Sequence, residues 1–213
     1  MIRILGLVVA LQVAASASAW ACDGQVGNVI FEDTFTDDSG GWDLAPPVVT
    51  VKPPALLLAL DSKYPSYATQ DLTFHATDGD YCMEVVLPKP ATPDNSMSAG
   101  IEFWASDYNN LMLVQMSSNG GVFLDSRTAG NWQTIFSATA GTAFKADPGA
   151  VNALRLISKN GKLTISLNGT QIKIIRAQVP QGNLRFGIYG QFDKTPDASP
   201  PIEVRSFKVT TGP

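Results

Sequence analysis

Apolar residues along the chain come in short runs, and many of these runs alternate with polar residues. GIEFWA (100–105) and KLTISLN (162–168) show this alternation, which is the spacing of a β-strand with one buried face. After the first 21 residues, no segment keeps the spacing of an amphipathic helix over three turns. The pattern predicts strands over 28–35, 48–51, 55–60, 67–74, 81–87, 99–105, 110–116, 121–126, 132–138, 151–159, 162–168, 171–176, 183–189 and 202–209.

Turn-forming residues separate these runs. Glycine and asparagine stand together in SSNGG (117–121), TAGN (128–131), KNGK (159–162) and NGT (168–170), a composition typical of tight β-hairpins. About fourteen short strands joined by hairpins, with no crossover helix, predict an all-β fold, an antiparallel two-sheet β-sandwich or jelly roll. The proline-rich stretches are too short to separate domains, so we expect a single domain over 22–213.

The first 21 residues have the pattern of a secretory signal peptide. Arg3 supplies the positive start, an apolar stretch runs from Ile4 to Val13, and small residues follow. Cleavage after Ala19 or after Ala21 would each satisfy the small-x-small rule. An uncleaved membrane anchor is the alternative, although the apolar stretch is short for a bilayer span. We expect a secreted or periplasmic protein with no transmembrane segment after cleavage.

The chain has two cysteines, Cys22 and Cys82. In an oxidising compartment they are expected to form a disulfide that ties the N-terminal segment to the body of the domain. Lipidation of Cys22 is the weaker alternative, because Ala19 and Trp20 stand where a lipobox normally has leucine and a small residue.

Composition and charge exclude several functions. The net charge of −4 disfavours nucleic acid as a partner, and removal of the leader would leave 14 basic and 19 acidic residues, a net charge of −5. His75 is the only histidine, so a Ser–His–Asp site, a Cys–His site or a His-rich zinc site has little support. We interpret His75 as an ordinary residue at the end of a strand.

Alternation on the central strands predicts one polar face with aromatic residues. An unpaired glutamate is costly to bury between sheets, so Glu102 should face outward together with Trp104, leaving Ile101 and Phe103 in the core. The same reasoning places three further polar side chains on the outer face: Gln115, Asp125 and Arg127. Tyr108 and Trp132 should lie at the rim of this face. Aromatic rings stack on sugar rings, and the polar groups can hydrogen-bond hydroxyls, so this face is a candidate glycan site. Alternatively, the aromatic residues lie under a loop and Asp125–Arg127 is a surface pair.

The order of these features resembles a known superfamily. FEDTFTDDSGGW (31–42), SAGIEFWASDYNNLMLVQM (98–116), NALRLISKNGKLTISLNGTQI (152–172) and IEVRSFKVT (202–210) resemble concanavalin A-like lectin/glucanase sandwiches, in particular bacterial laminin G-like and 3-keto-disaccharide hydrolase-type domains. The likeness covers about residues 28–210. It implies the sandwich fold but no single activity.

One feature of the glucanases in this superfamily is absent. Their catalytic strand carries Glu-x-Asp-x-Glu or Glu-x-Asp-x-x-Glu, whereas this chain has only Glu32, Glu84, Glu102 and Glu203, none within four residues of another. Glucanase activity is therefore disfavoured. Some laminin G-like and jelly-roll domains bind calcium, for which Asp37 and Asp38 are the candidates here, although turn formation explains them equally well. No other cofactor is indicated.

Three functions follow from these observations. The first is a carbohydrate-binding module that recognises a glycan or cell-surface ligand through the outer face. The second is a glycosidase-type hydrolase in which Glu102 and Asp125 form the carboxylate pair. The third is an adhesion or structural domain with a protein partner.

Overall fold

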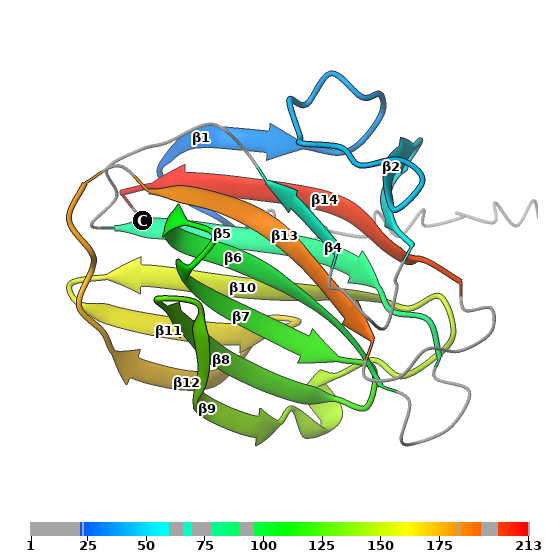
Figure 1. Ribbon diagram of the computed structural model, residues 1–213. Coiled ribbons are helices and arrows are strands. Elements are labelled where there is room, and N and C mark those ends of the chain that lie inside the picture. The colour runs from blue at the N-terminus through cyan, green and yellow to red at the C-terminus, as the bar shows by residue number, and fades with distance from the viewer. Residues whose placement is uncertain are drawn as a thin grey trace, which may run out of the picture.

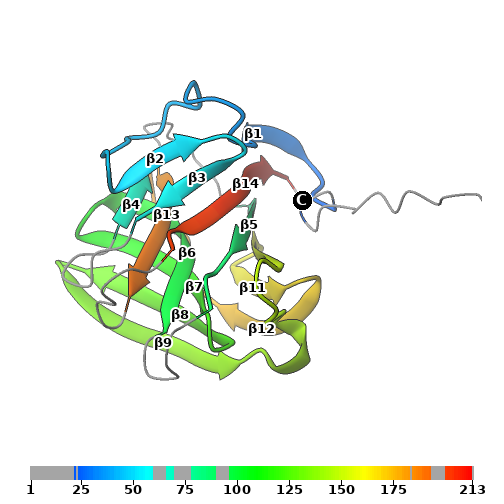
Figure 2. The same ribbon diagram turned by 90° about the vertical axis from the view of Figure 1, so that its right-hand side faces the viewer.

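Two antiparallel β-sheets form the molecule, as the computed structural model shows for residues 22, 24–59, 66–69, 78–89, 96–182, 184–192 and 200–212. The larger sheet has the order β12(Thr170–Arg176), β11(Lys162–Leu167), β10(Val151–Lys159), β5(Gly79–Val86), β14(Ile202–Thr211), β3(Ala55–Leu58) and β2(Val49–Lys52). β1(Asn28–Asp33) also pairs with β14, and it lies beside that strand in Figures 1 and 2.

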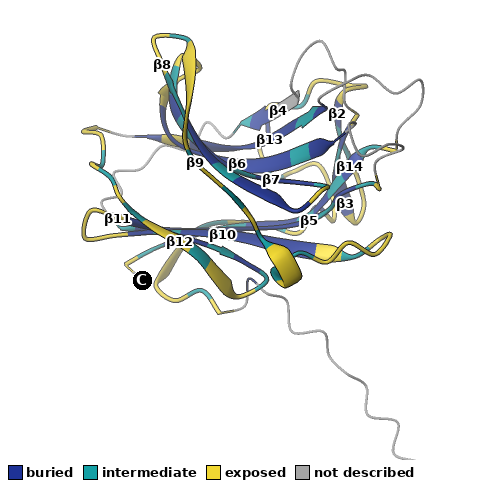
Figure 3. Ribbon diagram, turned by 90° about the horizontal axis from the view of Figure 1, so that it is seen from below, coloured by how far each residue is buried: buried dark blue, intermediate teal, exposed yellow. Residues whose placement is uncertain are grey.

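The smaller sheet has the order β4(Ser66–Thr69), β13(Arg185–Phe192), β6(Met97–Asp107), β7(Asn110–Ser117), β8(Gly121–Thr128) and β9(Asn131–Thr139). Figure 3 shows the two sheets as layers, with buried residues along their facing sides. The predicted all-β, antiparallel two-sheet sandwich is confirmed. In the described ranges the one helical segment is the 3₁₀ turn Gly141–Ala143, and no helix there is long and apolar enough to span a membrane.

The core lies between the sheets and has the residues that alternation predicts. Ile101 and Phe103 of β6 are fully buried in it. The same holds for the inward positions of the next two strands: Val114, Met116, Val122 and Leu124. Burial of these side chains is the main favourable contribution to folding.

The predicted hairpin turns are also confirmed. Asn160-Gly161 and Asn168-Gly169 connect β10 to β11 and β11 to β12, and all four residues have positive φ, between 50° and 78°. Two consecutive left-handed residues are what a type I′ turn requires, and asparagine and glycine adopt that conformation most readily.

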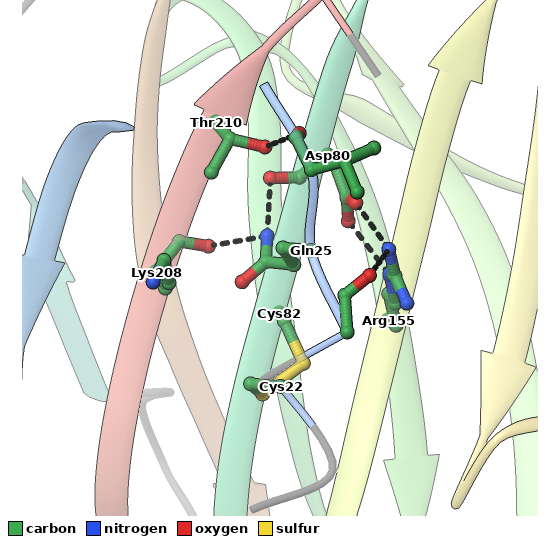
Figure 4. A network of polar contacts seen from close by, with 9 residues as sticks. Cys22, Gln25, Asp80, Cys82, Arg155, Lys208 and Thr210 are labelled. Atoms are coloured by element: carbon green, nitrogen blue, oxygen red, sulfur yellow. Dashed lines mark hydrogen bonds and ion pairs between the residues drawn. A yellow bond between two sulfur atoms is a disulfide. The ribbon is translucent and has the colours of Figure 1, made fainter. Parts of the chain in front are cut away.

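The predicted Cys22–Cys82 disulfide is present, with Cα atoms 5.6 Å apart. Cys82 lies on β5, on the outer face of the larger sheet, where Figure 4 shows the N-terminal segment crossing between β10 and β14. The bond fastens this segment to the middle of the sheet. The predicted signal peptide, residues 1–21, and His75 lie outside the described residues.

Candidate functional site

Polar side chains gather on the outer face of the smaller sheet in register across its strands. Backbone pairing aligns Glu102 with Leu113, Leu113 with Asp125, and Asp125 with Thr134. The next row aligns Gln115 with Phe123. The strands that carry these residues, β6 to β9, lie side by side in Figure 1. The outward orientation predicted for Glu102, Gln115 and Asp125 therefore agrees with the register.

Glu102 is far less exposed than an outward glutamate usually is. Its exposed fraction is 3%, and its Oε2 atom has no hydrogen-bond partner among the described residues. A Cβ atom on Gly187 would lie 3.2 Å from this oxygen, so the carboxyl group lies over a glycine of β13. Burial raises the pKa of Glu102 to about 7, and the positive charge of Arg127 partly opposes this effect.

A pocket of about 250 Å³ opens beside the Glu102 side chain. Its polar lining comes from β6 and the turn that follows it, from the loop before β2, and from the ends of β4 and β13. The polar residues lining it are Asp43, Thr69, Glu102, Asp107, Tyr108 and Arg185. The pocket thus offers one buried carboxyl group, two further carboxylates, a guanidinium group and an aromatic rim.

Asp125 has a different environment from Glu102. It is 7% exposed and accepts hydrogen bonds from Gln115 Nε2 at 2.8 Å and from Thr134 Oγ1 at 2.6 Å. Leu113, which is 1% exposed, occupies the position between Asp125 and Glu102. The Cα atoms of Asp125 and Glu102 are therefore two strand spacings apart, about 10 Å. Asp125 does not line the pocket at Glu102.

Tyr108, Arg127 and Trp132 form an exposed stack at the end of these strands. The Arg127 guanidinium carbon lies 4.0 Å from the centroid of the Tyr108 ring and 5.4 Å from that of Trp132. Arg127 also donates hydrogen bonds to the carbonyl oxygens of Gly130 and Tyr108. With exposed fractions of 54% and 45%, the two rings have surface available for a ligand. Tyr108 belongs to both the stack and the pocket, so the two are continuous.

The prediction that Trp104 shares the outer face with Glu102 is wrong. Between Phe103 and Asp107 the pairing of β6 with β7 slips, and Trp104 has a φ of 52°. Such a β-bulge turns the chain and re-aims the side chain. Trp104 is 4% exposed, belongs to the inter-sheet core, and packs against Phe103 with ring centroids 5.2 Å apart.

The calcium candidates lie in a turn. Asp37 Oδ1 accepts hydrogen bonds from the backbone nitrogen and hydroxyl of Ser39, and these bonds lower the pKa of Asp37. Within the described residues there is no group of three or more His, Cys, Asp or Glu side chains that could hold a metal ion. Asp37 thus has the role of a turn residue, in keeping with the alternative interpretation.

Sequence reasoning missed Asp43, Asp107 and Arg185. They lie far apart in the chain, and only the tertiary structure brings them to the pocket. Asp107 had a local signal, since SDYNN is a turn sequence. Its carboxylate accepts hydrogen bonds from the Asn109 backbone and the Asn110 side chain, which lower the pKa of Asp107.

Known proteins resemble this chain in structure but not in sequence. No family model and no curated protein matches the sequence. Among solved structures, the Emp47p carbohydrate recognition domain is similar over 85% of this chain and 95% of its own, with a TM-score of 0.66 and 11% identity. The Bacillus licheniformis beta-glucanase is similar over 88% of this chain and all of its own, with a TM-score of 0.61 and 12% identity.

A third similar structure is the carbohydrate-binding module CBM66 from Bacillus subtilis. The likeness covers 72% of this chain and 92% of that module, with a TM-score of 0.55 and 12% identity. At these identities the likeness concerns the fold alone. Together with the two-sheet topology, it shows that the chain has the fold of the concanavalin A-like lectin/glucanase superfamily.

Proposed function

We propose that this protein is an exported carbohydrate-binding module whose site is the Glu102 pocket together with the Tyr108–Arg127–Trp132 stack. The observation that carries the proposal is the continuity of the two through Tyr108. Exposed rings stack on the apolar faces of sugars, while carboxyl and guanidinium groups hydrogen-bond the hydroxyls. The similar structures named as carbohydrate-recognising proteins add support at the level of fold.

The chemistry of the pocket favours a neutral, hydroxyl-rich ligand. Asp43 and Asp107 line it together with the guanidinium group of Arg185, so an anionic ligand would meet unfavourable carboxylates. A Glu102 carboxyl with a pKa near 7 is largely protonated just below neutral pH, and in that form it can donate a hydrogen bond to a sugar hydroxyl. The proposal therefore specifies uncharged sugars.

Binding to a panel of uncharged oligosaccharides, measured by calorimetry on the ligand that a glycan array identifies, tests the proposal. Trp132→Ala and Tyr108→Ala should each weaken binding about tenfold, since each removes a stacking surface. Ile174→Ala is the matched control, because Ile174 is similarly exposed, at 48%, on the other sheet. Equal affinity in all three variants would refute this site, and no binding to any glycan would favour a protein partner.

A glycosidase-type hydrolase is the second candidate, and the pKa of Glu102 favours it. A carboxyl group with a pKa near 7 is suited to act as a general acid at neutral pH. The second carboxylate would be Asp43 or Asp107, which line the same pocket, in place of Asp125, which does not. Release of reducing sugar by the native protein would support this function if Glu102→Gln abolishes the release and Asp125→Asn retains it. No release from any oligosaccharide that binds would reject it.

A further inference from the structure

The N-terminal segment is fastened to the outer face of the larger sheet by contacts along its length. Besides the disulfide, Gln25 Nε2 donates to the carbonyl oxygen of Asp80 at 2.7 Å, and Thr210 Oγ1 donates to that of Val26 at 2.8 Å (Figure 4). Arg155 donates to the Gly24 carbonyl oxygen at 3.1 Å. Cys22 is itself only 5% exposed, so its backbone nitrogen has a defined place on the sheet.

That nitrogen lies next to a buried carboxylate. Glu84 of β5 is 2% exposed, and its Oε1 atom accepts a hydrogen bond from the Cys22 backbone nitrogen at 3.4 Å. Cys82, two residues before Glu84 on the same face of the strand, forms the disulfide with Cys22. The disulfide thus holds the Cys22 nitrogen within the 4 Å that defines an ion pair.

Three carboxylates of the larger sheet pair with side-chain cations. Asp80, fully buried, binds Arg155 with oxygen–nitrogen distances of 2.9 and 2.5 Å. Glu32 pairs with Lys208 at 3.2 Å, and Glu203 pairs with Arg205. At Glu84, the disulfide places the main-chain nitrogen of residue 22 beside the carboxylate.

A main-chain nitrogen becomes a cation when the peptide bond before it is cleaved. The Ala19-Trp20-Ala21 sequence satisfies the small-x-small rule for cleavage after Ala21. Hydrolysis of the Ala21–Cys22 bond consumes one water and gives a carboxylate on Ala21 and an α-ammonium group on Cys22. Such amines have a pKa of about 8 and are charged at neutral pH, so a neutral donor would become a charged one beside Glu84.

We propose that the mature protein begins at Cys22 and that its α-ammonium group forms a buried ion pair with Glu84. The proposal depends on the leader prediction and is independent of the sugar site. It selects between the two cleavage sites, since cleavage after Ala19 would place the charge two residues away, on Trp20. It also excludes a thioether lipid on Cys22, because that sulfur is in the disulfide.

Export of the full-length chain from a bacterium, followed by intact mass and N-terminal sequencing, tests the cleavage. We expect a protein that begins at Cys22, with a free amine and one disulfide. A start at Trp20, retention of the leader, or a lipid on Cys22 would each overturn the proposal. None of these readouts involves a sugar, so this test can fail without affecting the proposed function.

The pKa of the Cys22 α-amine tests the ion pair. A neighbouring carboxylate favours the charged form, so we expect this pKa to lie about one unit above its usual value, a tenfold shift in the protonation equilibrium, as measured by the pH dependence of amine acylation. Glu84→Gln should abolish the shift, and Glu32→Gln, a glutamate of the same face that pairs with Lys208, should leave it unchanged.

The pH dependence of the folding equilibrium gives a second test of the ion pair between Cys22 and Glu84. A raised amine pKa stabilises the fold below about pH 8, and this contribution is lost as the pH rises through the folded-state pKa. The unfolding midpoint of the Cys22-initiated protein should therefore fall between pH 7 and pH 10 by more than that of Glu84→Gln. If Glu84→Gln does not fold, the pKa of the Cys22 α-amine in the native protein still tests the ion pair. A pKa at the usual value for an α-amine would overturn it.

Discussion

Glu102 shows what a single buried carboxyl group does to stability. Its pKa is about 7 in the folded protein, against an ordinary value of 4.5, because burial disfavours the charged form. Between these two values the folded state binds the proton more tightly than the unfolded state. The contribution of Glu102 is therefore fully present below about pH 4.5 and is lost as the pH rises through 7.

Glu102→Gln should remove this pH dependence. Glutamine has nearly the same shape and stays neutral, so the variant should gain stability relative to the native protein as the pH rises from 4.5 to 8. The shift in pKa corresponds to about 3 kcal/mol at the upper end. Urea denaturation at several pH values measures the difference. A difference that stays constant over this range would contradict a buried, protonated Glu102.

Two tryptophans of the predicted site differ in what their removal should cost. Trp104→Ala should destabilise the protein by about 3–5 kcal/mol, since the ring is buried in the core. Trp132→Ala should cost less than about 1 kcal/mol, because this ring is 45% exposed on an edge strand. Thermal or chemical denaturation of both variants tests the contrast, which equal losses would contradict.

At the scale of the strand, the sequence predicted most of the fold because alternation and turn chemistry are local. An Asn-Gly pair between two closely spaced strands forms a hairpin turn. Asn160-Gly161 and Asn168-Gly169 form such turns at the expected positions. Strand ends were less well predicted: the run expected over 183–189 is β13, Arg185–Phe192. The pairing of a strand with its neighbour decides such limits, and that pairing is not local.

The β-bulge of β6 explains why the candidate site was only partly predicted. Alternation assumes an uninterrupted strand, and it placed Glu102 correctly on the outer face, before the bulge. Beyond Phe103 the chain slips against β7, and Trp104 turns into the core. The sequence AGIEFWASD does not predict this register shift, because the shift depends on how β6 fits between β7 and β13.

The disulfide connects the N-terminal segment, which hydrogen bonds of Gln25 and Arg155 also hold, to the larger sheet. Cys22 and Cys82 are 60 residues apart in sequence, and closing a loop of this length is worth about 4 kcal/mol in the chain-entropy model. Substitution of both cysteines by serine should lower the stability by about this amount and expose residues 24–27 to proteolysis. Denaturation and limited proteolysis of the double variant test this. Unchanged stability would mean that the hydrogen bonds of Gln25 and Arg155 hold the segment unaided.

At the scale of the whole molecule, the two sheets meet not only through the core but also at their edges. β9 ends the smaller sheet and β12 ends the larger one. Lys173 of β12 places its ammonium nitrogen 5.4 Å from the ring centroid of Phe136 on β9, and Phe136 packs against the core. This contact joins two edge strands that no backbone ladder connects, and β9 also carries Trp132 and Thr134 of the candidate site.

Phe136→Ala should therefore loosen β9 and β12 together. Loss of a half-buried aromatic ring should cost on the order of 2 kcal/mol, and amide hydrogen exchange should accelerate in both strands while β5 and β14, in the middle of the larger sheet, stay protected. Lys173→Ala removes the cation but keeps the ring, so its effect should be under about 1 kcal/mol. Because β9 positions Trp132 beside Arg127, Phe136→Ala should also weaken sugar binding, though less than Trp132→Ala. Faster exchange confined to β9 would show that the two edges are not coupled.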